Sequence, residues 1–201
     1  QGSAPVFVAL GATLREKDLP LEPFLDLLAA FRHDVTTTRH GTFDDLLAYC
    51  RLSANPIGRL VLLLSGIRDP ETHALADRVT TALQLANFWQ DVAVDLEKDR
   101  IYLPLEDLAR FGVTEDDLRA RRATPGFRAL LAHEVARTRT IFAEGAAVTT
   151  RVRGRLRFEL RLTWLGGMRV LDRIEALGFD TLTARPALGA RDWAALALRA
   201  A

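Results

Sequence analysis

The chain has 201 residues, of which 49% are hydrophobic, and this length and composition suffice for a single domain with a sizeable core. Its 27 basic and 26 acidic side chains leave a net charge of +1, which excludes an overall field that would attract nucleic acid or another polyanion. The only cysteine, Cys50, excludes an intramolecular disulfide and favours a reducing, cytoplasmic location.

Helix signals dominate the first half of the chain, where a polar cap or a proline precedes apolar residues spaced near 3.6. Thr42, with Asp45 three residues further on, has the spacing of a capping box. The apolar run at residues 57–67 is too short for a membrane span, which needs about 20 residues. We predict helices over residues 21–31, 42–52, 55–64 and 69–96, the first with Phe24, Leu27, Leu28 and Phe31 on one face.

The second half of the chain continues in the same manner. Pro104 marks a break, Thr114 caps a short helix that starts with acidic residues, and Pro125 opens the next helix. We predict helices over residues 125–149 and 155–177, and a last one from Arg191. Because alternating β-branched residues are scarce and no long linker occurs, we predict one all-α domain over residues 1–201.

The long helix predicted over residues 69–96 carries a narrow polar stripe. At about 100° per residue, Gln84, Asn87, Asp91 and Asp95 fall within an arc of roughly 80°, and the remaining sides are apolar. A helix that is apolar nearly all round is buried, where two carboxylates one turn apart repel each other and need a counter-charge. Mg²⁺ takes carboxylate and amide oxygens, so the stripe predicts a magnesium site. The alternative is the wet face of a surface helix.

Two residues beyond this stripe can serve an anion. Arg100 can neutralise a phosphate, and Tyr102 can offer a hydroxyl group or a π-face, in a loop that would fold over the bound group. The alternative is a salt-bridging arginine and a packing tyrosine.

Two segments of the sequence resemble the two signatures of the squalene and phytoene synthase family. Residues 84–104 have the pattern QxxNFxxDVxxDxxxxRxYxP of the second signature, with every spacing in place. Residues 49–58, YCRLSANPIG, resemble the first signature, which begins with Tyr-Cys and ends near a glycine. Within the family, both segments are most similar to the hydroxysqualene synthases of the bacterial hopanoid pathway.

The resemblance implies a fold and a role for each matched position. The implied fold is the all-α helical bundle of class I isoprenoid synthases. The implied catalytic residues are Tyr49 and Tyr102, the substrate-binding residues are Ser53, Gly58, Gln84 and Arg100, and the Mg²⁺ ligands are Asn87, Asp91 and Asp95. The small residues Ser53 and Gly58 would leave space for a long prenyl chain.

The resemblance also implies a reaction. In it, Mg²⁺ assists ionisation of a prenyl diphosphate, presqualene or farnesyl diphosphate, to a carbocation that gives hydroxysqualene or squalene. Gln90 stands where phytoene and dehydrosqualene synthases usually have arginine, which favours ionisation of one diphosphate over condensation of two. Such a greasy substrate can bring a cytoplasmic protein into peripheral contact with the inner face of a membrane.

The family's other acidic motif, a DxxxD on an earlier helix, does not occur upstream of Tyr49. The chain also starts Gln-Gly-Ser without a methionine. We therefore expect an N-terminally truncated bundle that is inactive by itself. The alternative is a non-catalytic relative that uses the same helical fold for binding or assembly. For the nearby acids, including Asp34, we expect roles as helix caps or exposed charges.

Two other groups of polar residues favour less specific interpretations. The four histidines, His33, His40, His73 and His133, lack the spacing of metal ligands, and we interpret them as solvated or core residues. The arginines at residues 151–161 could indicate nucleic acid, but an Arg-rich loop and helix start is favoured because no binding module accompanies them. A plain helical interaction domain, whose stripe meets a basic partner, is a third interpretation of the chain.

Overall fold

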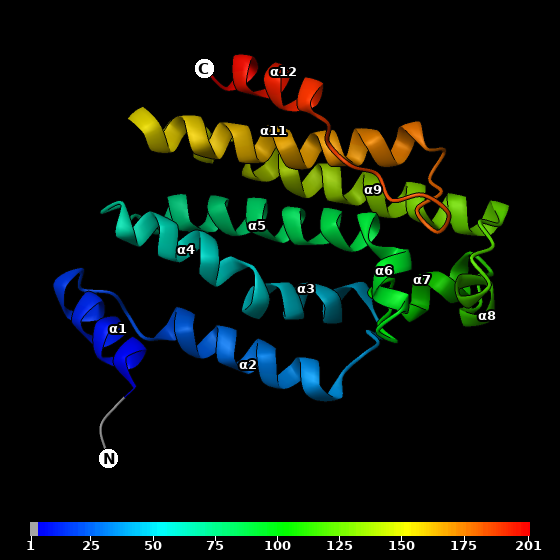
Figure 1. The fold of residues 1–201 in the computed structure, drawn as a ribbon, viewed down its shortest axis with the longest axis horizontal. Coiled ribbons are helices and arrows are strands. Elements are labelled where there is room, and N and C mark those ends of the chain that lie inside the picture. Colours follow the sequence, from blue (N-terminus) through cyan, green and yellow to red (C-terminus); the bar gives the residue numbers. More distant parts are fainter. Residues whose placement is uncertain (1–3) are drawn as a thin grey trace.

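The computed structural model of the chain describes residues 4–201, which form a bundle of helices (Figure 1). Within this range there is no strand, only a single bridge between Arg39 and Ile101. The helices are α1 Pro5–Glu16, α2 Glu22–Thr36, α3 Phe43–Ser53, α4 Asn55–Leu64, α5 Pro70–Gln90, α6 Val92–Leu96, α7 Leu105–Arg110, α8 Glu115–Arg119, α9 Pro125–Gly145, α10 Val148–Arg151, α11 Gly154–Ala176 and α12 Ala190–Ala200.

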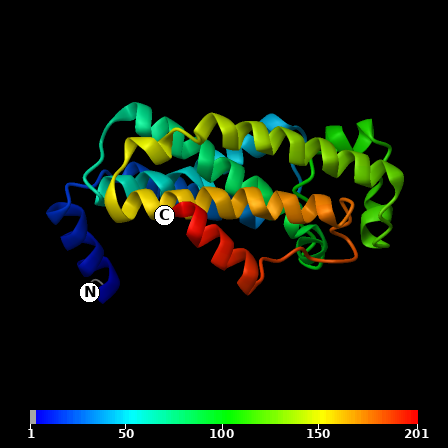
Figure 2. The ribbon, with the colours of Figure 1, turned by 90° about the horizontal axis from the view of Figure 1, so that it is seen from above.

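Helix α5 lies at the centre of the bundle, where it packs against α4, α9 and α11. Figure 2 shows α9 and α11 running along the long axis, with α12 set at an angle against α11. Leu85 and Trp89 of α5 are fully buried, and the Trp89 indole Nε1 donates to Thr138 Oγ1 of α9 at 2.8 Å. A Cβ atom on Gly167 would lie 2.7 Å from Leu83 Cδ2, so glycine lets α11 approach α5 closely.

Local sequence signals account for most of the helix starts. The Thr42 hydroxyl accepts from the Asp45 backbone N–H while the Asp45 carboxylate accepts from the Thr42 N–H, which confirms the predicted capping box. Thr114 and Asp117 form the same arrangement at α8. The helices predicted over residues 42–52, 55–64, 155–177 and from Arg191 are confirmed to within two residues.

Other expectations about the helices are corrected. The predicted helix 69–96 is two helices, because Asp91 (φ −105°, ψ 15°) interrupts the helical geometry. Asp91 nevertheless keeps a helical hydrogen bond on each side of the bend, since its N–H donates to Asn87 O and its carbonyl accepts from Asp95 N, each at 2.9 Å. The predicted helix 125–149 ends at Gly145, and α1 and α7 were not predicted at all.

A large apolar surface runs over α1, α2 and α4. The face predicted to be apolar on α2 is only partly buried, because Leu28 and Phe31 are half or more exposed. The exposed apolar side chains on these three helices are Val6, Phe7, Val8, Leu25, Leu28, Phe31, Val35, Ile57, Val61 and Leu64. Exposed apolar side chains gathered on several helices are typical of an interaction site. None of the helices within residues 4–201 is long and apolar enough to cross a membrane.

Candidate functional site

The polar edge of α5 continues through the bend into α6. Gln84 and Asn87 lie on the last turns of α5, Asp91 lies at the bend, and Asp95 lies on α6. The Asp91 and Asp95 side chains are only 16% and 15% exposed, whereas Asn87 is exposed and Gln84 is half-buried. The two carboxylates are therefore sheltered, which the wet face of a surface helix would not provide.

The two sheltered carboxylates differ in their partners. The Arg185 guanidinium donates to Asp91, with Nε 2.5 Å from Oδ1 and a second nitrogen 3.3 Å from Oδ2. The nearest cation to Asp95 is Lys98, at 3.9 Å. Burial, and then the charge of Asp91, raises the pKa of Asp95 above its usual range. Asp95 thus lies where a cation would be stabilised.

The donor set fits one kind of metal ion. Residues 4–201 contain no cluster of three or more His, Cys, Asp or Glu side chains that could hold a metal. Asn87, Asp91 and Asp95 instead offer one amide and two carboxylates. Mg²⁺ is typically bound by one or two carboxylates and completes its shell with water and substrate phosphates, so this set fits Mg²⁺ better than a metal that needs a full protein cage.

An aromatic cluster lies beside the carboxylates. Tyr49 of α3 is buried, and the rings of Phe88 and Tyr102 stack at 3.8 Å between centroids. Tyr49 lies 6.2 Å from Phe88 and 6.1 Å from Tyr102. Burial raises the pKa of both tyrosines, and the Asp34 carboxylate raises that of Tyr49 further, so both hydroxyl groups stay protonated at neutral pH. The fold therefore brings together the two predicted catalytic tyrosines, although one precedes and the other follows Phe88 in the sequence.

Arg100 joins this cluster through its hydrogen bonds. One guanidinium nitrogen lies 3.3 Å from the Tyr102 hydroxyl, and another donates to the backbone oxygen of Asp34 at 3.3 Å. The Asp34 carboxylate lies 3.9 Å from Arg100 and is mostly buried, so the expectation of a cap or an exposed charge there is wrong. His40 is buried against Tyr49 and Tyr102, which agrees with its interpretation as a core histidine.

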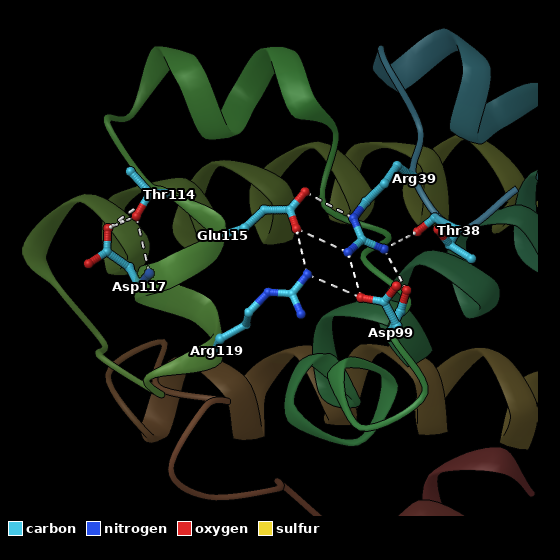
Figure 3. Close-up of polar contacts among 7 residues, drawn as sticks. All are labelled: Thr38, Arg39, Asp99, Thr114, Glu115, Asp117 and Arg119. Atoms are coloured by element: carbon cyan, nitrogen blue, oxygen red, sulfur yellow. Dashed lines mark hydrogen bonds and ion pairs between the residues drawn. The ribbon is translucent and has the colours of Figure 1, made fainter.

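A network of ion pairs fixes the loop that carries Arg100 and Tyr102 (Figure 3). Arg39 donates to both oxygens of Glu115 at 3.0 Å, to the Asp99 carboxylate at 2.9 Å and to the Asp99 backbone oxygen at 2.5 Å. Asp99 has a φ of +53°, in the left-handed region. Arg39 lowers the pKa of both Asp99 and Glu115. The loop is therefore held by contacts that span three segments of the chain.

Two adjoining cavities lie between α5 and α11. The larger, of about 550 Å³, lies between Asn87 and Gln90 of α5, Gly166 of α11 and Arg185. The smaller, of about 290 Å³, is lined by Gly58, Ile57 and further apolar side chains of α4, α5 and α11. Both cavities reach Leu83 and Thr163, so they follow one another along α5.

The small residues predicted to leave space have more specific positions. A Cβ atom on Gly58 would lie 2.7 Å from Thr80 Cγ2, so this glycine permits close packing of α4 on α5 as well as lining the smaller cavity. The Ser53 hydroxyl donates to the backbone oxygen of Tyr49 at 3.0 Å, within its own helix, and Ser53 does not line either cavity.

Arg185 is a site residue that the sequence analysis missed. It follows α11 in a segment without regular structure and lies 94 positions from Asp91 in the sequence. No local motif surrounds it, and only its contact with Asp91 in the folded chain identifies it. Asp34 was missed for the same reason, since its partners Tyr49 and Arg100 come from other elements.

Comparison with known proteins places this geometry in a family. Residues 1–192 match the family described as squalene/phytoene synthase. The phytoene synthase of Thermus thermophilus is 38% identical over 188 residues, which cover 93% of this chain and 64% of that protein. The chloroplastic phytoene synthase 1 of Arabidopsis thaliana is 31% identical, over 90% of this chain and 44% of that protein. The chain thus spans less than two thirds of the length of these relatives.

Solved structures give a similar picture. The squalene synthase HpnC from Alicyclobacillus acidocaldarius superposes with a TM-score of 0.86 at 45% identity, over 89% of this chain and 68% of that one. A dehydrosqualene synthase in complex with a ligand superposes with a TM-score of 0.88 over 99% of this chain and 70% of that one. At 23% identity, this second likeness concerns the fold alone.

Proposed function

Since the chain belongs to the squalene/phytoene synthase family and has the helical fold of isoprenoid synthases, we propose that it carries the diphosphate-activating wall of an enzyme that ionises a prenyl diphosphate. The observation that carries this proposal is the sheltered pair Asp91 and Asp95, of which Asp91 is bonded to Arg185 in the lining of the larger apolar cavity. A pair of carboxylates in such surroundings is stable only with a cation beside it.

We assign the metal ligands on this basis. Asn87, Asp91 and Asp95 would hold Mg²⁺, which when bound neutralises negative charge on a diphosphate and makes it a better leaving group. Arg185 is bonded to Asp91, and Arg100 lines a small pocket with Asp95, so both guanidinium groups can bind phosphate oxygens there. Both cations come from loops, so both depend on contacts that hold those loops in place.

The cavities and the aromatic cluster suit the prenyl part of the substrate. The cavity walls are mainly apolar, with Leu83 between the larger and the smaller space. Tyr49, Phe88 and Tyr102 line neither cavity, but they pack beside Asp95, where their π-faces can stabilise a carbocation electrostatically. The protonated tyrosine hydroxyl groups add no negative charge that would trap the cation. Exclusion of water by these walls would delay capture of the cation until the correct carbon is exposed.

We further propose that the reaction is ionisation of presqualene diphosphate, or of farnesyl diphosphate, to give hydroxysqualene or squalene. The 45% identity to a squalene synthase supports this choice, and the 38% identity to a phytoene synthase keeps phytoene synthesis as the competing assignment. Gln90 supports the first choice, because its uncharged amide supplies no phosphate-binding cation on α5.

The rest of the fold bears on activity. Because the chain spans about two thirds of the Thermus phytoene synthase and of HpnC, we propose that a further segment of the fold completes the domain by covering the exposed apolar side chains of α1, α2 and α4. The 201-residue chain alone would then turn over little substrate. The same exposed surface supports the second candidate function, a non-catalytic binding or assembly protein with this fold.

The test uses a polypeptide that carries this chain together with the remaining third of the relatives' fold. Pyrophosphate release from presqualene and farnesyl diphosphate is measured with and without Mg²⁺, and the products are identified by mass spectrometry. We expect Asp91→Asn and Asp95→Asn to abolish release, and the exposed Asp116→Asn to leave it unchanged. Turnover that survives the first two substitutions would reject the enzymatic assignment in favour of the binding protein.

A further inference from the structure

The segment between α11 and α12 returns along the bundle and touches α5. Residues 184–189, called the C-terminal strap below, have no regular structure and run back from the far end of α11 to α12 (Figure 1, orange to red). Three strap residues, Arg185, Ala187 and Leu188, line the larger cavity. The strap is therefore one wall of the space that we assign to the substrate.

Both ends of the strap are anchored away from the site. Before it, the Asp180 carboxylate accepts from Arg128 of α9 at 2.9 Å. After it, the buried Asp192 accepts from the Gly189 backbone N–H at 3.0 Å and from Arg169 and Arg173 of α11. These anchors fix where the strap starts and ends, but they do not determine how closely its middle approaches α5.

Two neighbouring residues of α5 and its bend hold the middle of the strap. The Gln90 side-chain amide Nε2 donates to the backbone oxygen of Pro186 at 2.5 Å. Their sequence neighbours also form a pair, since Arg185, which precedes Pro186, donates to Asp91, which follows Gln90. Gln90 is half-buried and Pro186 is buried, so their hydrogen bond is sheltered from water, whereas the Arg185 side chain is half exposed. The sheltered bond is the better anchor of the two.

We propose that Gln90 is a positioning residue that latches the C-terminal strap onto α5 and so delivers Arg185 to the diphosphate. This inference rests on the proposed function. A cation bound between Asp91 and Asp95 would take the place of the Arg185 guanidinium at Asp91, and the strap would then lose one of its two contacts with α5. The Gln90–Pro186 bond does not involve a carboxylate, so it persists and keeps Arg185 at the cavity mouth.

The chemistry of glutamine suits this role. Its amide has a donor for a backbone carbonyl and no charge, so it holds the strap without repelling Arg185 or competing for Asp91. A guanidinium group at position 90 would lie close to Arg185, and the two positive charges would repel each other. With glutamine at position 90, the phosphate-binding cation is therefore Arg185 on the strap and not an arginine on α5.

The first test measures the latch in the 201-residue chain by hydrogen–deuterium exchange of peptides that cover residues 180–193. Gln90→Met removes the donor at nearly constant length, and Gln90→Glu places an acceptor against the Pro186 carbonyl. We expect strap amides to exchange about tenfold faster in both variants, which corresponds to about 1.4 kcal/mol. The exposed Arg191→Met serves as the control and should leave exchange unchanged. Unchanged exchange in Gln90→Met would overturn the latch.

The second test measures delivery of Arg185, in the polypeptide that includes the remaining third of the fold. Calorimetry gives the affinity for inorganic pyrophosphate in the presence of Mg²⁺. We expect Gln90→Met to weaken it roughly tenfold, and to have no further effect when Arg185→Met is already present, because the two residues act in series. Additive losses, or an unchanged affinity in Gln90→Met, would overturn the positioning role even where the exchange result holds.

The two tests separate this inference from the proposed function. If the unmodified protein binds no pyrophosphate with Mg²⁺, the proposed function fails and delivery of Arg185 fails with it. Faster exchange in Gln90→Met would in that case still establish the latch as a structural contact. If the unmodified protein binds pyrophosphate and Gln90→Met has no effect in either test, the function stands and the role of Gln90 is refuted.

Discussion

Replacement of Arg39 by methionine tests whether the network in Figure 3 holds the loop that carries Arg100 and Tyr102. Methionine keeps most of the aliphatic length of the side chain and removes the guanidinium group. The substitution deletes hydrogen bonds to both Glu115 oxygens, to the Asp99 carboxylate, and to the backbone oxygens of Thr38 and Asp99. The two backbone oxygens lose a charged donor, and neither is part of a helix ladder.

The expected loss of stability follows from these contacts. Each hydrogen bond to a backbone oxygen contributes about 1 kcal/mol. The forked pair with Glu115 adds about 1 kcal/mol, because the Arg39 side chain is only 19% exposed while Glu115 is partly open to water. We therefore expect Arg39→Met to lower the free energy of unfolding by about 3 kcal/mol. For a chain of this size, that corresponds to a fall in melting temperature of roughly 6–12 °C.

Calorimetric or circular-dichroism melting measures this change, with Arg119→Met as the matched control. Arg119 donates to the same two carboxylates, Asp99 and Glu115, but not to the backbone. We expect the control to lower the melting temperature by less than a third as much. Equal shifts for Arg39→Met and Arg119→Met would refute the reasoning, because backbone anchoring would then contribute nothing.

The same network predicts a dependence on pH. Because Arg39 lowers the pKa of Asp99 and Glu115 in the folded chain, their contribution is fully present above the unfolded values near about pH 4. It is lost as the pH falls through the lowered values. The difference in stability between the unmodified chain and Arg39→Met should therefore be constant from pH 5 to about pH 7 and shrink below about pH 4.

Three further substitutions test other parts of the structure. Asp95→Asn should raise the melting temperature of the metal-free chain, because burial raises the pKa of Asp95 and so disfavours its charged form. The same substitution should abolish the rise in melting temperature that Mg²⁺ causes in the unmodified chain. If Mg²⁺ still raises the melting temperature of Asp95→Asn, Asp95 is not a ligand. Gly167→Ala should cost about 1–3 kcal/mol in urea unfolding, because its Cβ would overlap the Phe142 ring, while Gly166→Ala meets no atom within 4 Å and should cost far less. Asp192→Asn should release α12, seen as faster amide exchange there; since the Asp192 pKa is lowered by the Gly189 N–H and two arginines, the unmodified chain should show the same release only as the pH falls well below about 4.

Local signals in the sequence predict the helix starts well, because capping residues act over three or four positions. Thr42 with Asp45 and Thr114 with Asp117 each contain the whole interaction within one turn. The bend at Asp91 has no such signal, because no proline, glycine or capping pair marks it in the sequence. A periodic pattern cannot distinguish one straight helix from two helices that follow one another in the same register.

The candidate site divides in the same way. The spacing of Asn87, Asp91 and Asp95 along one edge depends only on helix geometry, and it was predictable. The partners of these residues were not, because Arg185 lies 94 positions from Asp91. The Arg39–Glu115 pair, 76 positions apart, is equally invisible in the sequence, as each residue alone is an ordinary surface charge.

The long-range contacts of the site share one physical purpose under the proposed function. A diphosphate leaving group must be bound by cations during ionisation and released afterwards. The cationic side chains should therefore be able to move, while the loops that carry them stay in place. Arg100 lies on a loop held by Arg39 and Asp99, and Arg185 lies on a strap held by Gln90. In both cases the segment is held in place by a contact that does not involve Asp91 or Asp95. The guanidinium groups can then exchange carboxylate for phosphate without unfolding the segments that carry them, which a cation fixed directly on α5 would not allow.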